Sequence, residues 1–463
     1  MGSMTCILYS GKPIWNHSMP NVLTNRKSEE KVVVDKEVYD KFIIPYLTLI
    51  EALSKEYKVK LDNSFTELVN FKTNKLLPIH NWFDYKQGYA DGLVRRLIEV
   101  SKIDKDDYIL DPFNGVGTTQ VTSQKLGIKS VGLDINPVAN FAAKVKTTKY
   151  SDNDKKIIGQ TLTDISNYYK KTKRVPKYKK INEIFTPQQL VQILNIKGFY
   201  ESIDSTNVRD FFKLAYLSII EDISNRVKDG NGIKIARTKK PIIDVYKYYE
   251  LKCHRMLSEL PKTKSLPDAK IIDGSILDDK VYEKLKKLNI GGVIYSPPYA
   301  NCFDYLEVYK MEVWLGDFVN DYEDFVKFRS VAIRSHVNSK FSKIIKHKNA
   351  KVEVISSLIG AHNIWNKNIP SMLLGYFDDM HEVIRRTYEI SREGSLCAIV
   401  VANSGYKGVI VPTDLLLADI ANQIGYKVEE ILLAREIRAS SQQMALFKGK
   451  NSLMRESIII LRK

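Results

Sequence analysis

The sequence predicts an α/β fold built around a mainly parallel sheet, and three stretches of the chain support this prediction. The first, DYILDPFNGVGTT at residues 107–119, reads as a strand, a glycine turn and the start of a helix. The second, SVGLD at residues 130–134, is a strand candidate that ends in an acid. The third, Val293–Tyr295, is a buried strand candidate that ends at two prolines. A strand, a glycine turn and a helix start are how α/β proteins bring backbone N–H groups to a nucleotide-like ligand.

The glycine turn indicates what kind of ligand it serves. A dinucleotide site would have a third glycine where Gln120 stands, and a phosphate-binding loop would have a lysine after a glycine. Asp111 at the strand end suits a ligand with an amino group and a positive centre, as in S-adenosylmethionine. Asp134 follows the glycines by about 20 residues, where a carboxylate accepts hydrogen bonds from ribose hydroxyls. The alternative is a tight turn in some other α/β protein.

Composition favours a polyanionic partner. The 463 residues carry a net charge of +17, which favours nucleic acid before a membrane surface. Four cysteines stand far apart without a CxxC pair, which argues for a reducing compartment and against structural zinc. No apolar run approaches the roughly 20 residues of a membrane span, and no signal peptide pattern opens the chain. We therefore expect a cytoplasmic, nucleoid-associated protein with no membrane or metal partner.

The chain before the glycine turn has two notable segments. Apolar residues repeat at three and four over Lys36–Tyr57, which predicts a helix. An aromatic loop followed by an amphipathic helix is predicted over Pro78–Val100, directly before the glycine strand. This loop could close over the ligand, or Trp82, Phe83 and Tyr85 could be core aromatics.

A long basic segment separates two core strands. Ser151–Pro267 is Lys-rich and helical in pattern, too long for a connecting loop, so it reads as a separate helical module. Within it, YYKKTKRVPKYKK at Tyr168–Lys180 interleaves aromatics with cations and is a candidate for phosphate contacts. The alternative is an ordinary solvated face.

The third strand candidate is followed by the proline motif Ser296-Pro297-Pro298-Tyr299. Two prolines fix φ and free the neighbouring carbonyls from a sheet ladder, so the segment is stiff and presents acceptors. Stiff acceptors beside an aromatic face suit an exocyclic amine on a planar base. A strand terminator with a packing tyrosine is the alternative.

Together, DPFNGVGTT, GLDINP and YSPPY resemble the DNA amino-methyltransferases, which use S-adenosylmethionine to methylate cytosine N4 or adenine N6. HNWFDYKQGY, SREGSLCAIVVANS, VPTDLLLADIANQIGYKV and RESIIILRK resemble further parts of that family. The resemblance implies an α/β, Rossmann-like class I methyltransferase fold with a mixed, mainly parallel seven-stranded sheet and helical insertions. The implied segments are an N-terminal helical extension (1–75), a cofactor-binding first part of the catalytic domain (76–150), a basic helical insertion that is a candidate target-recognition module (151–267), a second catalytic part with SPPY (268–309), a second insertion with possible DNA contacts (310–385) and a third catalytic part (386–463).

The resemblance also implies the site residues. The cofactor S-adenosylmethionine would meet Asp111, Phe113, Gly115, Gly117 and Thr118 at its methionine end, Asp134 at its ribose and Ile135 at its adenine. Either Asp273 or Ser275 would reach the adenine amino group, because the local DGS departs from the common order. The full cofactor set is Tyr85, Asp111, Pro112, Phe113, Gly115, Gly117, Thr118, Thr119, Asp134, Ile135, Asn136, Asp273 and Ser275. The catalytic set is Ser296, Pro297, Pro298 and Tyr299.

The function implied is methylation of a flipped-out cytosine at N4 in double-stranded DNA, within a restriction-modification system that has a cognate endonuclease. In the resembling families Ser at the head of the motif accompanies cytosine N4, whereas Asp or Asn accompanies adenine N6. Ser296 Oγ and the Pro297 carbonyl would accept from the amine, and Tyr299 would stack on the base. Methylation at C5 would need a Cys in the proline motif, and Cys302 lies outside it. Adenine-N6 methylation, RNA base methylation and non-catalytic nucleic-acid binding stay open.

Overall fold

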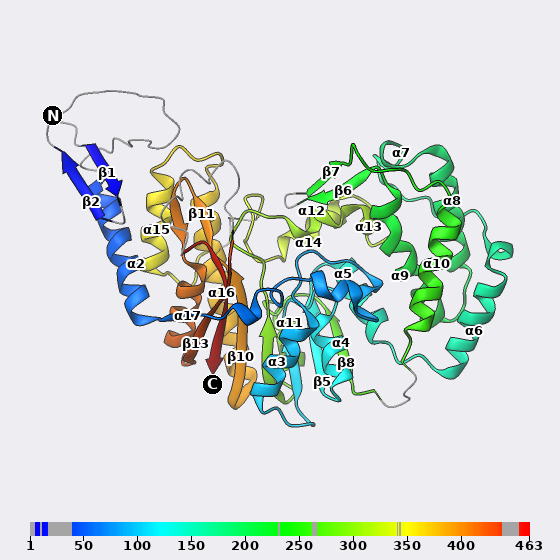
Figure 1. Cartoon of the computed structure of the whole chain (residues 1–463), viewed down its shortest axis with the longest axis horizontal. Helices are drawn as coiled ribbons and strands as arrows, with labels where there is room; N and C mark the ends of the chain where they lie inside the picture. The colour runs from blue at the N-terminus through cyan, green and yellow to red at the C-terminus, as the bar shows by residue number, and fades with distance from the viewer. Residues whose placement is uncertain are drawn as a thin grey trace.

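The computed structural model describes residues 5–9, 12–16, 39–229, 232–261, 266–339, 341, 344–437 and 453–463. At the centre of this part lies one mixed sheet (Figure 1). Its strands are β3 (Val59–Leu61), β4 (Tyr108–Asp111), β5 (Lys129–Asp134), β8 (Ala269–Asp273), β9 (Ile290–Tyr295), β10 (Ser391–Ala402), β13 (Lys427–Glu436) and β14 (Arg455–Arg462). They lie in the order β3-β13-β14-β10-β9-β4-β5-β8.

The sheet is mainly parallel. Strands β8, β5, β4, β9 and β10 run parallel to one another, and β14 runs antiparallel to both β10 and β13. The predicted α/β fold is therefore confirmed. The predicted number of strands is wrong by one in the described residues, because β3 pairs in parallel with β13 and makes an eighth strand. This short strand covers a sheet edge that would otherwise present unpaired backbone groups.

The order of the strands creates a crevice at the centre of the sheet. From β4 the chain moves outward through β5 to β8, and it then returns to β9 on the other side of β4 and continues to β10. The loops after β4 and β9 therefore leave the sheet in opposite directions. In open α/β sheets, ligands bind at this switch point, outside the carboxyl ends of the strands.

Helices cover both faces of the sheet. On one face, α16 and α17 pack in one cluster with Val293, Tyr295 and Ile399. On the other face, α3 packs with Ile109 and Ile294. Because successive strand residues point to opposite faces, Ile294 and its two neighbours divide between these clusters. The helices are α3 (Asp91–Ser101), α4 (Thr118–Lys125), α5 (Pro137–Thr147), α11 (Asp279–Leu285), α16 (Ile369–Ile390) and α17 (Thr413–Ile424).

The N-terminal extension is not helical throughout, contrary to the expectation from its sequence. The helix predicted over Lys36–Tyr57 is present as the π-helical turn η1 (Tyr39–Ile43) and α2 (Ile44–Glu56), and residues 36–38 lie outside the described part. Strands are present as well, in the hairpin of β1 (Thr5–Tyr9) and β2 (Lys12–Asn16) and in β3. Short runs without period-two alternation carry no readable strand signal, which explains the difference. The turns η2 (Asn63–Phe65), η3 (Lys72–Leu76) and η4 (His80–Trp82) lead to α3.

The basic insertion forms a helical module on the side of the sheet away from α2 (Figure 1). The side chains of α9 that form its centre include Phe211, Phe212 and Tyr216, all fully buried. A β-hairpin, which the sequence did not predict, lies between α9 and α10. The elements of the module are α6 (Asp152–Thr163), η5 (Ile165–Tyr168), α7 (Ile181–Ile184), α8 (Pro187–Glu201), α9 (Thr206–Ile223), β6 (Arg226–Asp229), β7 (Gly232–Ile235) and α10 (Val245–Ser258).

The second insertion runs over the top of the sheet in Figure 1 and then back onto it. Its last helix, α16, packs against the sheet, so the boundary expected at residue 385 is wrong and falls inside this helix. The remaining elements are α12 (Tyr305–Val308), α13 (Lys310–Leu315), α14 (Tyr322–Ser330), α15 (Ala350–Gly360) and the hairpin of β11 (Ser404–Tyr406) and β12 (Val409–Val411).

Candidate active site

The glycine turn after β4 is shaped by two glycines with positive φ. The φ angles are 49° at Gly115 and 81° at Gly117, a region that residues with a Cβ rarely adopt. A Cβ on Gly115 would lie 2.7 Å from the ring of Tyr85, and one on Gly117 would lie 2.9 Å from Ala143 Cβ. The turn needs glycine both for its backbone and for the close approach of Tyr85 and α5.

Asp111, at the end of β4, is a structural carboxylate. It is 1% exposed and accepts hydrogen bonds from Tyr89 OH at 2.7 Å, Thr119 Oγ1 at 2.7 Å and the Phe113 amide at 3.0 Å. Burial raises its pKa to about 6, although these donors oppose the shift. These bonds join the end of β4 to the start of α4 and fix the conformation of the turn between them.

A cavity of about 370 Å³ lies at the carboxyl ends of the central strands. It brings together residues from both predicted sets. From the cofactor set, its walls contain Tyr85, Pro112, Phe113, Asp134, Ile135, Asn136 and Ser275. From the catalytic set, they contain Ser296, Pro297, Pro298 and Tyr299. The remaining predicted residues do not line the cavity: Asp111, Gly115, Gly117, Thr118, Thr119 and Asp273.

Asp134 is the strand-end carboxylate that faces the cavity. Its Oδ1 accepts from the Asn136 amide at 2.8 Å, and its Oδ2 accepts from the Gly115 amide at 2.9 Å. Burial raises its pKa to about 6, while the backbone donors oppose the shift. Each carboxylate oxygen can accept a second hydrogen bond, so Asp134 can still receive two hydroxyls from a ligand.

Of the two candidates at the end of β8, Asp273 and Ser275, only Ser275 lines the cavity. Asp273 is exposed and accepts from Asn140 Nδ2 at 3.0 Å and Lys144 Nζ at 2.6 Å. Its contacts therefore hold α5 against β8. Gly274 between them has a φ of 137°, which turns the chain so that the serine follows into the cavity wall.

The aromatic loop before α3 is divided between core and cavity. Trp82 and Phe83 are buried in the cluster that includes the helical module, and Trp82 Nε1 donates to Glu259 Oε2 at 2.9 Å. Tyr85 lines the cavity and stacks on Tyr309, with 5.0 Å between ring centroids. Trp82 and Phe83 are therefore core aromatics, whereas Tyr85 belongs to the same core and also lines the cavity.

The proline motif after β9 is hydrogen-bonded to the carboxylate of Glu456. Tyr299 OH donates to Glu456 Oε1 at 2.5 Å, and Ser296 Oγ donates to Tyr299 OH at 3.4 Å. Arg435 Nε donates to Glu456 Oε2 at 2.6 Å. Burial and the Glu456 carboxylate raise the pKa of Tyr299 well above its usual range, so its phenol is a neutral donor.

Sequence reasoning missed Glu456 and Arg435, which both line the cavity. They lie at the facing ends of β14 and β13, where they are paired across the ladder. The available signal was RESIIILR, in which two charged residues open a strand whose centre is apolar. A buried charge is retained only with a partner, so such a pair indicates a specific contact.

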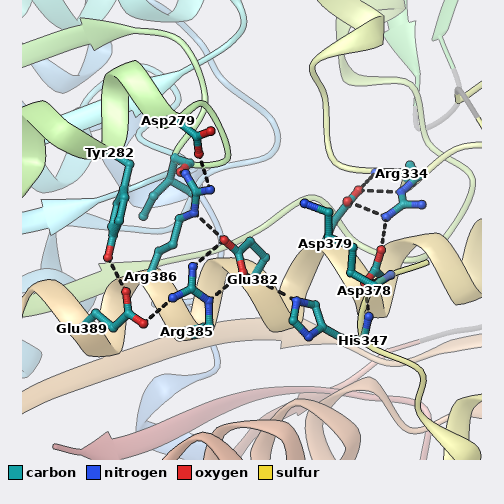
Figure 2. Close-up of polar contacts among 12 residues, drawn as sticks. Asp279, Tyr282, Arg334, His347, Asp378, Asp379, Glu382, Arg385, Arg386 and Glu389 are labelled. Atoms are coloured by element: carbon teal, nitrogen blue, oxygen red, sulfur yellow. Dashed lines mark hydrogen bonds and ion pairs between the residues drawn. The ribbon is translucent and has the colours of Figure 1, made fainter. Parts of the chain in front are cut away.

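Part of the cavity wall is a loop at residues 331–337, which sequence reasoning also missed. Arg334 fastens it to α16: the guanidinium donates to Asp378 Oδ2 at 2.6 Å and to Asp379 Oδ1 at 2.7 Å (Figure 2). Ser335 and His336 beside it line the cavity. Two adjacent carboxylates opposite a distant arginine give no sequence pattern, so only the fold could show this pairing.

The helical module meets the same cavity through its hairpin. Lys228 of β6 is buried and its Nζ lies 2.5 Å from Glu312 Oε1 and 3.4 Å from Glu221 Oε2. Burial opposes its charge, but the two carboxylates raise its pKa. The next residue, Asp229, lines the cavity. A buried ion cluster therefore joins the module to α13 of the second insertion near the site.

The described residues include no group of three or more His, Cys, Asp or Glu side chains arranged to hold a metal. Among the described helices, none is long and apolar enough to cross a membrane.

Comparisons with known proteins agree with this site. A family model for N6 and N4 methyltransferases, described as DNA methylase, matches residues 16–145, which include the glycine turn and Asp134. The chain is 29% identical to the type II methyltransferase M.BsoBI of Geobacillus stearothermophilus, over 86% of this chain and 88% of the relative. It is 25% identical to M.AvaI of Anabaena variabilis, over 92% and 95%, and 21% identical to M.MvaI of Kocuria varians, over 80% and 86%. The chain is therefore similar over most of its length to type II DNA methyltransferases, and its residues 16–145 match the N6 and N4 DNA methylase family model.

Proposed function

We propose that this protein methylates N4 of a flipped-out cytosine in double-stranded DNA at a specific site, as the modification enzyme of a type II restriction-modification system. The observation that carries the proposal is the shared cavity: it contains the ribose-binding candidate Asp134 and the amine-binding candidate Ser296. The relatives M.BsoBI and M.AvaI are named type II methyltransferases, which supports the restriction-modification role.

The cofactor half of the cavity fits S-adenosylmethionine chemically. Asp134 offers carboxylate oxygens for the ribose hydroxyls, and Phe113 and Ile135 offer apolar contact beside it. Ser275 offers a hydroxyl near the end of β8. When bound, this cofactor supplies an electrophilic methyl group on a sulfonium. We assign the remaining members of the cofactor set, including Asp111 and Gly117, to shaping the turn rather than to direct contact.

The target half holds and orients an amine. An aryl amine is a poor nucleophile because its lone pair is delocalised into the ring. Ser296 Oγ and the Pro297 carbonyl accept hydrogen bonds from its two N–H groups and draw the nitrogen towards sp³ geometry, which aims the lone pair at the methyl group. Tyr299 supports the base. Flipping the base costs a few kcal/mol, which stacking in the cavity helps to offset. Most of the remaining rate gain comes from holding amine and methyl group in line.

The base is tested by nucleoside analysis. DNA from cells that express the protein is digested to nucleosides, which are separated and identified by mass. We expect N4-methylcytosine in DNA from these cells and none in DNA from cells that express Ser296→Ala. N6-methyladenine alone would reject cytosine as the target while leaving the fold and the cofactor half unchanged. Methyl transfer to structured RNA but not to duplex DNA would reject the DNA substrate.

A further inference from the structure

Three side chains form a continuous hydrogen-bonded chain across the target half of the cavity. Ser296 Oγ donates to Tyr299 OH at 3.4 Å, and Tyr299 OH donates to Glu456 Oε1 at 2.5 Å. Each hydroxyl therefore uses its proton to bond toward Glu456. The lone pairs of Ser296 Oγ are left for a donor in the cavity, which is what an acceptor of amine protons needs.

The carboxylate at the end of this chain is fixed from its other side. Arg435 Nε donates to Glu456 Oε2 at 2.6 Å, which leaves Oε1 directed at Tyr299. Glu456 is 3% exposed, so its charge is little screened by water. Tyr299 is held at its backbone as well, where its amide donates to Tyr305 OH at 3.1 Å. The geometry of the chain is therefore set before any substrate binds.

We propose that Ser296, Tyr299 and Glu456 act as a proton relay during methyl transfer, with Glu456 as the terminal base. This inference rests on the proposed function, but it holds for a cytosine or an adenine amine. Ser296 carries no charge of its own, and the relay gives it the negative partner that an Asp at the same position would supply directly.

The atoms of the step balance as follows. A carbon–nitrogen bond forms, the carbon–sulfur bond of the methyl donor breaks, and the amine nitrogen must lose one proton. That proton passes to Ser296 Oγ as the serine proton passes to Tyr299 and the tyrosine proton passes to Glu456. Ser296 and Tyr299 end with one proton each, and Glu456 ends as a carboxylic acid. The direction is favourable because a methylated exocyclic ammonium on an electron-poor ring, such as that of cytosine or adenine, is a far stronger acid than a carboxylic acid.

Two conservative variants interrupt the relay at different links. Tyr299→Phe keeps the ring that stacks on the base but removes the hydroxyl, and Glu456→Gln keeps the shape but removes the base. Tyr282→Phe is the matched control, because Tyr282 OH donates to Glu389 Oε2 at 2.6 Å in a tyrosine–glutamate pair outside the cavity (Figure 2). Three quantities are measured for each: the single-turnover rate of methyl transfer, the cofactor dissociation constant, and base flipping from 2-aminopurine fluorescence at the target position.

Both relay variants should slow transfer by about 10- to 100-fold, within the lower range of general acid–base catalysis. Cofactor affinity and the flipping signal should stay at wild-type levels, and the Tyr282→Phe control should match wild type in all three. The double variant should be little slower than either single variant, since each already interrupts one pathway.

Wild-type transfer in Tyr299→Phe would overturn the relay, as would a loss of flipping in proportion to the loss of rate, since that would make the hydroxyl structural. Absence of methyl transfer to any DNA by the wild-type protein would instead reject the proposed function. If Glu456→Gln fails to fold, Tyr299→Phe alone still decides the relay.

Discussion

The two halves of the cavity are assembled in different ways. The cofactor half comes mainly from one continuous stretch, residues 108–136, in which β4, the glycine turn, α4 and β5 follow one another. The target half comes from four segments that meet only in the folded protein: the proline motif, the loop at residues 331–337, and the ends of β13 and β14. A local motif thus defines the cofactor half, whereas long-range contacts define the target half.

The largest effect is expected where the target half is fastened to α16. Arg334→Met should lower the free energy of unfolding by about 3 to 5 kcal/mol, because it leaves the carboxylates of Asp378 and Asp379 buried without a cation. Urea denaturation measures this change. Arg385→Met on the same helix is the control: its ion pair with Glu382 is more exposed and should be worth no more than about 1 kcal/mol. Equal destabilisation in both variants would mean that the loop is not held by Arg334.

Removal of Ser296 Oγ, the proposed acceptor for the amine, should slow methyl transfer without changing cofactor binding. Ser296→Ala should slow methyl transfer by about a hundredfold or more, by analogy with the loss of one preorganised hydrogen-bond partner at a reacting group. The cofactor dissociation constant should not change, because Ser296 belongs to the other half. A Ser296→Ala protein with wild-type turnover would remove this serine from the catalytic set.

The cofactor half is tested by comparison of its two strand-end carboxylates. Asp134→Ala should weaken cofactor binding about tenfold or more, because it removes charge-assisted hydrogen bonds of about 1.5 to 3 kcal/mol. Asp111→Asn keeps the shape of a residue that does not line the cavity, so it should alter stability more than affinity. Calorimetry gives both dissociation constants. The reverse order of affinities would exchange the roles of the two residues.

The same carboxylate predicts a pH dependence. The pKa of Asp134 in the free protein, about 6, lies above its ordinary value of 3.8, so it becomes protonated as pH falls through 6. Cofactor affinity should therefore fall below pH 6, and Asp134→Asn should flatten this change. The stability of the free protein moves the other way through this group, because the folded carboxyl takes up a proton that the unfolded chain does not bind until near pH 3.8. An affinity independent of pH in this range would show that the charge of Asp134 is not used.

The smallest effect per residue, on DNA binding, is expected in the cationic loop of the helical module, within the segment Tyr168–Lys180. Thr172, Pro176 and Tyr178 are buried while the cations between them are exposed, and Tyr178 stacks on Trp314 of α13 at 6.2 Å. The loop can lie this close to α8 because that helix has Gly198 at the contact. The exposed cations are Lys171, Lys173, Arg174, Lys177, Lys179 and Lys180.

Neutralising these six residues should weaken binding to all DNA sequences alike. It should also flatten the salt dependence of binding, by a slope of about 0.9 for each DNA phosphate that the loop no longer neutralises. Titration at several salt concentrations measures the slope. Neutralising Lys280, Lys284 and Lys287 near α11, which are also exposed, controls for half of this change in net charge. Weakening confined to the cognate site would mean that the loop reads bases.

The sequence allowed prediction of the elements that contain local signals. The strands at Tyr108, Ser130 and Val293, and the helix after the glycine turn, were predictable because apolar runs end at glycine, acid or proline. The same signals did not distinguish Asp111 from Asp134, since both end a strand beside the turn. Their difference depends on Tyr89 and Thr119, which both donate to Oδ2 of Asp111, and on the Phe113 amide, which donates to Oδ1.

The parts that could not be predicted depend on distant pairings. Glu456 reaches Tyr299 only because β14 inserts between β10 and β13, and Arg334 meets Asp378 only because α16 returns to the sheet. β3 is too short to show alternation. Each of these contacts forms only when distant strands and helices come together in the fold. No local pattern in the sequence therefore predicts it.

The central claim, that one cavity has a cofactor half and a target half, is tested most directly by measuring two quantities on two variants. These are the cofactor dissociation constant and the single-turnover transfer rate at saturating cofactor, for Asp134→Ala and Ser296→Ala. We predict a crossed result: Asp134→Ala loses affinity but keeps a transfer rate within a few-fold of wild type, and Ser296→Ala keeps affinity but loses the rate. Loss of both quantities in both variants would contradict the division of the cavity.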